Sequence, residues 1–154
     1  MAEKLVVYDS VFGNTAKVAQ AMGEALGSVP VKKVNEVQPA DLEDLKILIV
    51  GSPTRAFRAT PATMTFLKGL KSGSLQGVKA AAFDTRIPFE RAKPAFLRLM
   101  IRLFGYADTK IAKALNKAGA SLPLESAGFG VTDTEGPLIE GELERAEAWA
   151  KKIL

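Results

Sequence analysis

Short apolar runs recur along the chain and alternate with longer stretches of helical periodicity. Residues 5–8, 47–50 and 78–83 are short runs that are apolar apart from Lys79, which is typical of strands that are buried on both faces. Residues 31–37 are more polar and alternate, a pattern that favours an edge strand. Residues 127–131 are a weaker candidate because they contain two glycines. The sequence therefore predicts five strands.

Helical patterns fill the intervals, over residues 15–26, 60–70, 108–118 and 138–153. Alternation of strands with helices predicts parallel βαβ units and a three-layer α/β sandwich. A five-stranded parallel sheet favours the strand order 2-1-3-4-5, with ligands bound above the carboxyl ends of the strands between the first and third. We expect a single domain over residues 1–154, with a basic and apolar insert near residues 86–107.

Composition excludes several kinds of chemistry. The chain contains no cysteine and no histidine, which excludes disulfides, thiol catalysis, zinc–thiolate sites and histidine-based proton transfer. We accordingly expect no metal site. The apolar run at residues 5–8 is too short for a signal peptide, and no run of about eighteen apolar residues is present. These features predict a cytoplasmic protein.

Positive charge is concentrated in one segment. The formal net charge is +4, yet residues 86–117 hold eight basic and two acidic residues, so this segment carries +6 and the rest of the chain −2. Its basic residues share a helical stretch with large apolar side chains and lack interleaved stacking aromatics. We therefore expect no nucleic-acid partner.

The loop after the first strand has the composition of an anion site. Gly13 supplies a turn that leads into a helix N-terminus, whose free N–H groups and positive dipole favour a phosphate, and Ser10 and Thr15 add hydroxyl groups. The alternative is a plain strand-to-helix turn with Asn14 or Thr15 as N-cap. The loop is not a P-loop because no Gly-Lys-Ser/Thr follows, and the glycines at 128–130 do not complete a Rossmann motif.

The stretch VVYDSVFGNTAKVAQAM, residues 6–22, resembles the signature of the flavodoxin family. The matching positions are Val6, Val7, Tyr8, Ser10, Gly13, Thr15 and Ala19. The resemblance implies a flavodoxin-like fold that binds FMN. It also implies that hydroxyl groups and backbone amides hold the phosphate, at Ser10, Val11, Phe12, Gly13, Asn14 and Thr15. Family members usually carry Thr at the position of Phe12, so one hydroxyl donor is missing here.

Two further loops resemble the flavin loops of that family. The implied cofactor-binding residues are Ser52, Pro53, Thr54, Arg55, Ala56 and Phe57 after the third strand, and Asp84, Thr85 and Arg86 after the fourth. Neither loop contains the Trp or Tyr that often stacks on the flavin. We expect Phe57 either to cover one ring face or to pack on the helix at 60–70. Ile87 and Phe89 are then candidates for the other face, with Arg86 beside the ring.

The resemblance implies chemistry that belongs to the flavin, in an electron carrier or a small flavin oxidoreductase with no catalytic side chain. Arg55, Arg58 and Arg86 lie near the predicted site, and their positive charge is expected to raise the flavin potential. The basic surface predicts an acidic redox partner protein, and a small-molecule electron acceptor is the alternative. The missing stacking residues also leave open an FMN-free interaction module. No oligomeric state follows from the sequence.

The insert contains a further predicted helix, which Pro94 can begin and Gly105 can end. Seven of its residues are apolar, and Arg98 and Arg102 share one face. Either the helix packs beneath the domain, or residues 94–104 meet a partner or an anionic membrane, which would make the protein peripheral to that membrane. In the second case the protein resembles in kind the menaquinone-dependent protoporphyrinogen oxidases. That resemblance implies a membrane-associated FMN oxidoreductase linked to quinone.

Overall fold

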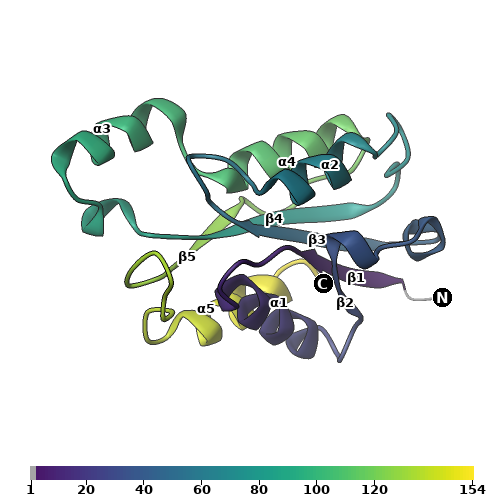
Figure 1. Ribbon diagram of the computed structural model, residues 1–154. Coiled ribbons are helices and arrows are strands. Elements are labelled where there is room, and N and C mark those ends of the chain that lie inside the picture. The colour runs from purple at the N-terminus through teal and green to yellow at the C-terminus, as the bar shows by residue number, and fades with distance from the viewer. Residues whose placement is uncertain (1–2) are drawn as a thin grey trace.

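The protein forms a five-stranded parallel sheet in the order β2-β1-β3-β4-β5, which confirms the predicted order (Figure 1). The computed structural model describes residues 3–154. The strands are β1 (Lys4–Tyr8), β2 (Val31–Lys33), β3 (Ile47–Pro53), β4 (Lys79–Arg86) and β5 (Ala127–Gly130). Strands β3 and β4 are the longest, with β3 at the centre and β4 beside it, and the carboxyl ends of β3, β4 and β5 extend beyond that of β1.

Helices cover both faces of the sheet. The five α-helices are α1 (Asn14–Ala25), α2 (Pro61–Lys68), α3 (Ala95–Phe104), α4 (Ala107–Lys117) and α5 (Glu142–Lys151). Helices α1 and α5 pack on one face and α2 and α4 on the other, whereas α3 stands away from the sheet at one end (Figure 1). Short 3-10 turns are formed by Val34–Glu36, Pro39–Leu42 and Phe89–Arg91.

Strands β1, β3 and β4 are largely apolar because they are buried on both faces. Along β3, Leu48 and Val50 pack in the core beside α2 and α4, and Ile47 and Ile49 pack in the core beside α1 and α5. Side chains of a strand alternate between faces, so a strand between two helical layers needs apolar residues at every position. The three-layer arrangement was therefore readable from the sequence.

Two predicted elements are shorter in the structure, each for a local reason. Strand β2 ends at Lys33 because its partner β1 ends at Tyr8, the residue opposite it, and residues 34–36 turn away. Helix α5 begins at Glu142 instead of residue 138 because Leu138 pairs with Val131 in an isolated bridge. Gly141 then takes a positive φ of 89° at the N-cap, a conformation that suits glycine.

Gly51 lets the centre of the sheet close tightly. A Cβ atom at this position would lie 2.0 Å from Cζ of the fully buried Phe83 on β4. The aromatic ring therefore occupies the space of the missing side chain, immediately before the loop that follows β3. Among residues 3–154, no helix has the length and apolar character needed to cross a membrane.

Candidate functional site

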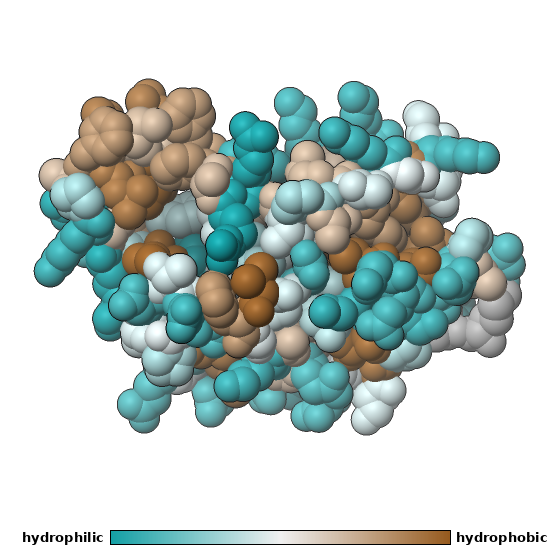
Figure 2. All heavy atoms as spheres, viewed as in Figure 1, coloured by the Kyte–Doolittle hydropathy of each residue, from teal (hydrophilic) through white to brown (hydrophobic). Residues whose placement is uncertain are grey.

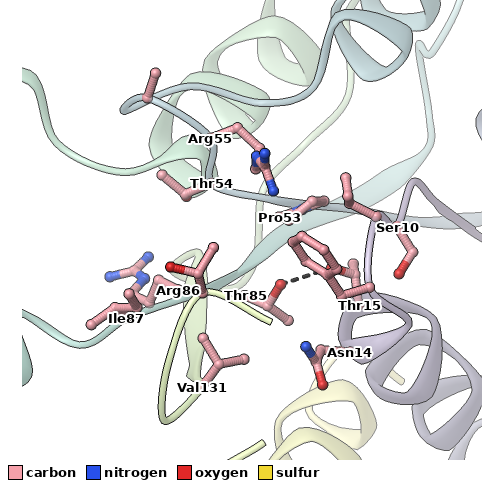
Figure 3. A pocket seen from close by; sticks show the side chains of 14 residues that line it. Ser10, Asn14, Thr15, Pro53, Thr54, Arg55, Thr85, Arg86, Ile87 and Val131 are labelled. Carbon is pink, nitrogen blue, oxygen red and sulfur yellow. Dashed lines mark hydrogen bonds between the residues drawn. The ribbon is translucent and has the colours of Figure 1, made fainter. Parts of the chain in front are cut away.

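A cavity of about 280 Å³ lies above the carboxyl ends of the strands, where three loops and the start of α1 converge (Figure 3). Its lining comes from the loop after β1, the loop after β3, the end of β4 and the segment after β5. The residues are Ser10, Val11, Phe12, Asn14, Thr15, Pro53, Thr54, Arg55, Ala56, Thr85, Arg86, Ile87, Val131 and Thr134. This is the crevice at which the strand order reverses, as the fold class predicts.

The loop after β1 presents the N-terminus of α1 to this cavity. Gly13 is the N-cap and has a φ of 95°, and the Ser10 hydroxyl accepts hydrogen bonds from the N–H groups of Gly13 (3.1 Å) and Ala16 (3.3 Å). Among residues 3–154, no acceptor meets the N–H groups of Asn14 and Thr15. Ser10, and neither Asn14 nor Thr15, thus supplies the capping hydroxyl, and two N–H donors stay free at the positive end of a helix dipole.

Hydrogen bonds between loops fix the shape of the cavity floor. The hydroxyls of Thr15 and Thr85 lie 2.7 Å apart, and this bond joins α1 to the end of β4 (Figure 3). The N–H of Thr54 donates to the carbonyl of Thr85 at 3.0 Å. The Asn14 amide donates to the carbonyl of Glu135 at 3.1 Å, which brings the segment after β5 against the start of α1. The three loops are therefore held together without any ligand contact.

The loop after β3 contains a tight turn that the sequence did not indicate. Arg55 and Arg58 exchange two backbone hydrogen bonds, and the residues between them, Ala56 and Phe57, have positive φ values of 49° and 69°. Such a two-residue turn usually carries Asn or Gly, and this loop has neither. The Lys110 ammonium group on α4 donates to the carbonyl of Phe57 and supports the turn, and desolvation lowers the pKa of that ammonium group.

Arg55 crosses from the second loop to the first. Its guanidinium carbon lies 5.4 Å from the centre of the Phe12 ring, a cation–π distance. Phe12, the residue that stands where family members carry Thr, therefore supports a cation at the rim of the cavity. A guanidinium group beside free helix N–H groups makes this end of the cavity a strong anion environment.

Asp84, which the sequence predicted as a cofactor contact, does not line the cavity. Asp84 is fully buried behind the cavity, where its carboxylate accepts two hydrogen bonds from Arg86, at 2.6 and 2.7 Å, and one from the N–H of Asp108 at 3.0 Å. Burial raises the pKa of Asp84 to about 6, although Arg86 and the Asp108 N–H favour its ionised form. Asp84 therefore positions Arg86 and the start of α4.

The Arg86 guanidinium group is held by more partners than the sequence indicated. A second carboxylate, that of Asp108, lies 3.1 Å from it, and its guanidinium carbon lies 3.7 Å from the centre of the Tyr106 ring. Two carboxylates thus face one guanidinium group. Arg86 is therefore compensated by acidic groups, whereas Arg55 lines the cavity and has no carboxylate partner among the ion pairs of residues 3–154.

Eleven of the fifteen residues predicted to contact the cofactor line the cavity, and Gly13, Ser52, Phe57 and Asp84 do not. Gly13 acts through its backbone at the N-cap. Ser52 is fully buried, and its hydroxyl accepts from the N–H of Thr60 and donates to the carbonyl of Pro53. Gly13 and Ser52 therefore support the loops beside the cavity without lining it.

A second cavity of about 200 Å³ adjoins the first one and lies against α3. It shares Thr54, Ala56, Arg86 and Ile87 with the first cavity, and it adds Phe57, Leu97, Ile101 and Tyr106. The Tyr106 hydroxyl donates to the carbonyl of Ile87 at 3.0 Å. This tyrosine, far along the chain from the third loop, therefore brings an aromatic ring to the site that sequence reasoning missed.

Phe57 and Phe89, the aromatic residues predicted to cover the flavin ring, instead contact residues of α3. Phe57 packs on Phe104 of α3, with ring centres 5.6 Å apart, and it lines the second cavity and not the first. Phe89 lies outside both cavities, 5.2 Å beneath the guanidinium group of Arg102. Val131 and Thr134, after β5, line the first cavity but were not predicted. The only signal for them was the polar and glycine-rich run that follows the fifth strand.

Metal chemistry finds no support in the arrangement of acidic residues. Among residues 3–154, no three acidic side chains gather closely enough to hold a metal ion. The site is instead built from hydroxyl groups, backbone N–H groups and a guanidinium group, which suit an anion.

Solved structures resemble this chain over nearly its whole length. Oxidised flavodoxin 2 from Bacillus cereus matches with a TM-score of 0.76 and 21% identity, over 99% of this chain and 97% of that chain. A flavodoxin from the domain Archaea matches with a TM-score of 0.71 and 20% identity, over 97% and 94% of the two chains. A scan against models of protein families finds no match.

A larger protein contains the same arrangement as one part. Rubredoxin oxygen:oxidoreductase from Desulfovibrio gigas matches with a TM-score of 0.74 and 20% identity, over 99% of this chain but 35% of that chain. Together with the sheet order, these matches show that the protein has a flavodoxin-like fold.

Proposed function

We propose that the protein binds FMN in the cavity above β1, β3 and β4 and works in electron transfer, as a carrier or as a small flavin oxidoreductase. The observation that carries the proposal is the free pair of N–H groups at Asn14 and Thr15, which faces the cavity beside Arg55. A phosphate monoester matches these donors in charge and in hydrogen-bond type. The likeness to solved flavodoxins adds an argument by analogy, because fold alone does not determine function.

The two adjoining cavities suit the two ends of FMN. The first cavity has the hydroxyl and N–H groups that a phosphate and a ribityl chain require. The second has Ile87, Leu97, Ile101 and the Tyr106 ring, which suit the apolar edge of an isoalloxazine ring. Tyr106 thus takes the place of the aromatic residue missing from the two loops.

FMN supplies the redox chemistry when it is bound, and the chain binds and orients it. Arg55 and the start of α1 hold the phosphate, Thr85 and Thr54 hold the polar chain, and Arg86 stays fixed by its two carboxylates. The basic surface around the site supports a partner with an acidic docking face or a small anionic acceptor.

Binding of FMN and of riboflavin by flavin-free protein tests the phosphate site directly. Quenching of flavin fluorescence on titration gives both dissociation constants. Riboflavin lacks only the phosphate, so we expect FMN to bind at least about tenfold more tightly, since charge-assisted hydrogen bonds are worth about 1.5–3 kcal/mol.

The variant Arg55→Gln separates the phosphate contact from the ring contact. We expect it to weaken FMN binding several-fold and to leave riboflavin binding unchanged. Arg91→Gln is the matched control, because Arg91 is exposed and lies outside both cavities. Equal affinity for FMN and riboflavin would contradict the phosphate site. A protein that ignores both flavins would instead support the FMN-free interaction module.

A further inference from the structure

Helix α3 exposes an apolar face that nothing in the fold covers. Four of its side chains are largely exposed: Phe96 (67%), Leu99 (52%), Leu103 (67%) and Phe104 (51%). Among residues 3–154, only four other large apolar side chains are exposed: Val11 and Phe12 in the loop after β1, Leu143 on α5 and the C-terminal Leu154. Figure 2 shows the apolar side chains gathered in one projecting cluster, over the part of the molecule where Figure 1 places α3. An apolar patch of this kind marks an interaction surface.

The helix is attached to the domain by its opposite edge. Ile101 is buried to 9% exposure, and with Leu97 it lines the second cavity. The predicted alternative, in which the whole helix packs beneath the domain, therefore holds for that edge alone. The exposed face is not a by-product of loose packing, because Gly105 and the Phe57–Phe104 contact fix how the helix leaves the domain.

Basic residues precede and interrupt the apolar run of α3, and the nearest acidic residue before it in sequence is the exposed Glu90. Arg91, Lys93, Arg98 and Arg102 are all exposed, and residues 91–107 contain no Asp or Glu. Arg98 and Arg102 are one turn apart and lie beside Leu99 around a shallow depression on the helix surface. Long basic side chains beside an apolar stripe can place their charges at the level of lipid phosphates while the stripe enters the acyl region.

We propose that α3 is a docking helix for an anionic lipid bilayer. The charge of the flanking residues is complementary to anionic headgroups, and each such residue near the surface adds to the attraction. The shape favours a bilayer over a protein, because α3 projects from the domain as a convex ridge (Figures 1 and 2). A soft lipid interface adapts to a ridge, whereas a protein partner would need a matching groove. The proposal goes beyond FMN binding and does not depend on it.

Sedimentation with lipid vesicles tests the proposal. Full-length protein is mixed with phosphatidylcholine vesicles that contain or lack phosphatidylserine, with and without added FMN. We expect binding to the anionic vesicles only, to the same extent with and without FMN. Binding is expected to be lost in about 1 M salt, where the screening length is about 3 Å.

Two double variants separate α3 from general apolar exposure. Leu99→Glu with Leu103→Glu is expected to weaken vesicle binding at least about tenfold, since two exposed leucines that would enter the acyl region are exchanged for groups of the same charge as the anionic headgroups. The matched control is Leu143→Glu with Leu154→Glu, which changes two exposed leucines elsewhere and should bind as wild type does. Circular dichroism confirms that each variant is folded.

Three results would overturn the proposal. Wild-type protein that does not sediment with anionic vesicles would refute it, and so would an equal loss of binding in the control variant. Self-association in the absence of vesicles, measured by analytical ultracentrifugation and abolished by the α3 variant, would show that a second copy of the chain covers this face.

Discussion

Replacement of Asp84 by Asn should make the stability of the protein less dependent on pH between about 4 and 7. The Asp84 carboxyl is fully buried, and burial raises its pKa from 3.8 to about 6. The neighbouring Asp108 carboxylate acts in the same direction, whereas Arg86 and the Asp108 N–H oppose it. Asn keeps the size of the side chain and removes its titration.

The sign follows from proton binding. Between the two pKa values the folded protein holds a proton at Asp84 that the unfolded chain has lost, so folding is favoured by acid. The contribution is complete below about pH 3.8 and is lost as the pH rises through about 6. The shift is about two pH units, which corresponds to about 3 kcal/mol of unfolding free energy. Because the carboxyl has no contact with water, solvent screening does not reduce this figure.

Urea unfolding from pH 4 to 7.5, followed by the fluorescence of Trp149, measures the effect. Trp149 is the only tryptophan of the chain and packs against Phe83 and Phe129 in the core. We expect the unfolding free energy of wild type, minus that of Asp84→Asn, to fall by about 3 kcal/mol over this range. The exposed Asp133, changed to Asn, is the control and should give a flat difference. A difference that rises with pH would refute the reasoning, because the Arg86 ion pair would then outweigh burial.

Three further predictions concern the loops around the site, and each is measured by urea unfolding. Gly51→Ala should cost about 3 kcal/mol or more, because its Cβ would overlap the Phe83 ring, and Phe83→Leu in the same chain should recover part of it; an additive double variant would contradict this. Thr60→Ala should cost about 1 kcal/mol, because Thr60 is the N-cap of α2 and accepts from the N–H of Thr63; no change would show that the cap is dispensable. Ala56→Asn should add roughly 0.5–1 kcal/mol, because Asn tolerates the positive φ at this position; destabilisation would argue against strain in the turn.

The fold was readable from the sequence because its determinants are local. The inner parts of β1, β3 and β4, residues 5–7, 47–50 and 80–83, are apolar at every position, as segments buried on both faces must be. The ends of β2 and α5 were not readable, because they depend on partners elsewhere in the chain. Strand β2 ends opposite the last residue of β1, and α5 begins only after Leu138, which pairs with Val131.

Some residues of the site were also predictable from the sequence and others were not. The contacts of the loop after β1 follow from Gly13 and a helix start that lie next to each other in sequence, and the structure places that loop at the cavity as expected. Tyr106 and Val131 reach the cavities only because α3 and β5 return to the same edge of the sheet. Residue spacing carries no signal for such returns.

A count of charged residues along the sequence does not show which of them are paired in the structure. Arg86 counts as +1 in the basic segment, yet it lies between Asp84, two residues earlier, and Asp108, which α4 brings back across the sheet. With both carboxylates ionised the cluster has a formal charge of −1, and protonation of Asp84, whose pKa is about 6, brings it to zero. The electrostatic environment of the proposed flavin therefore depends on pH and on Arg55, and a potential raised by three free arginines is no longer expected. This cluster predicts that the reduction potential of the bound flavin rises as the pH falls through about 6. The rise should be larger in wild type than in Asp84→Asn.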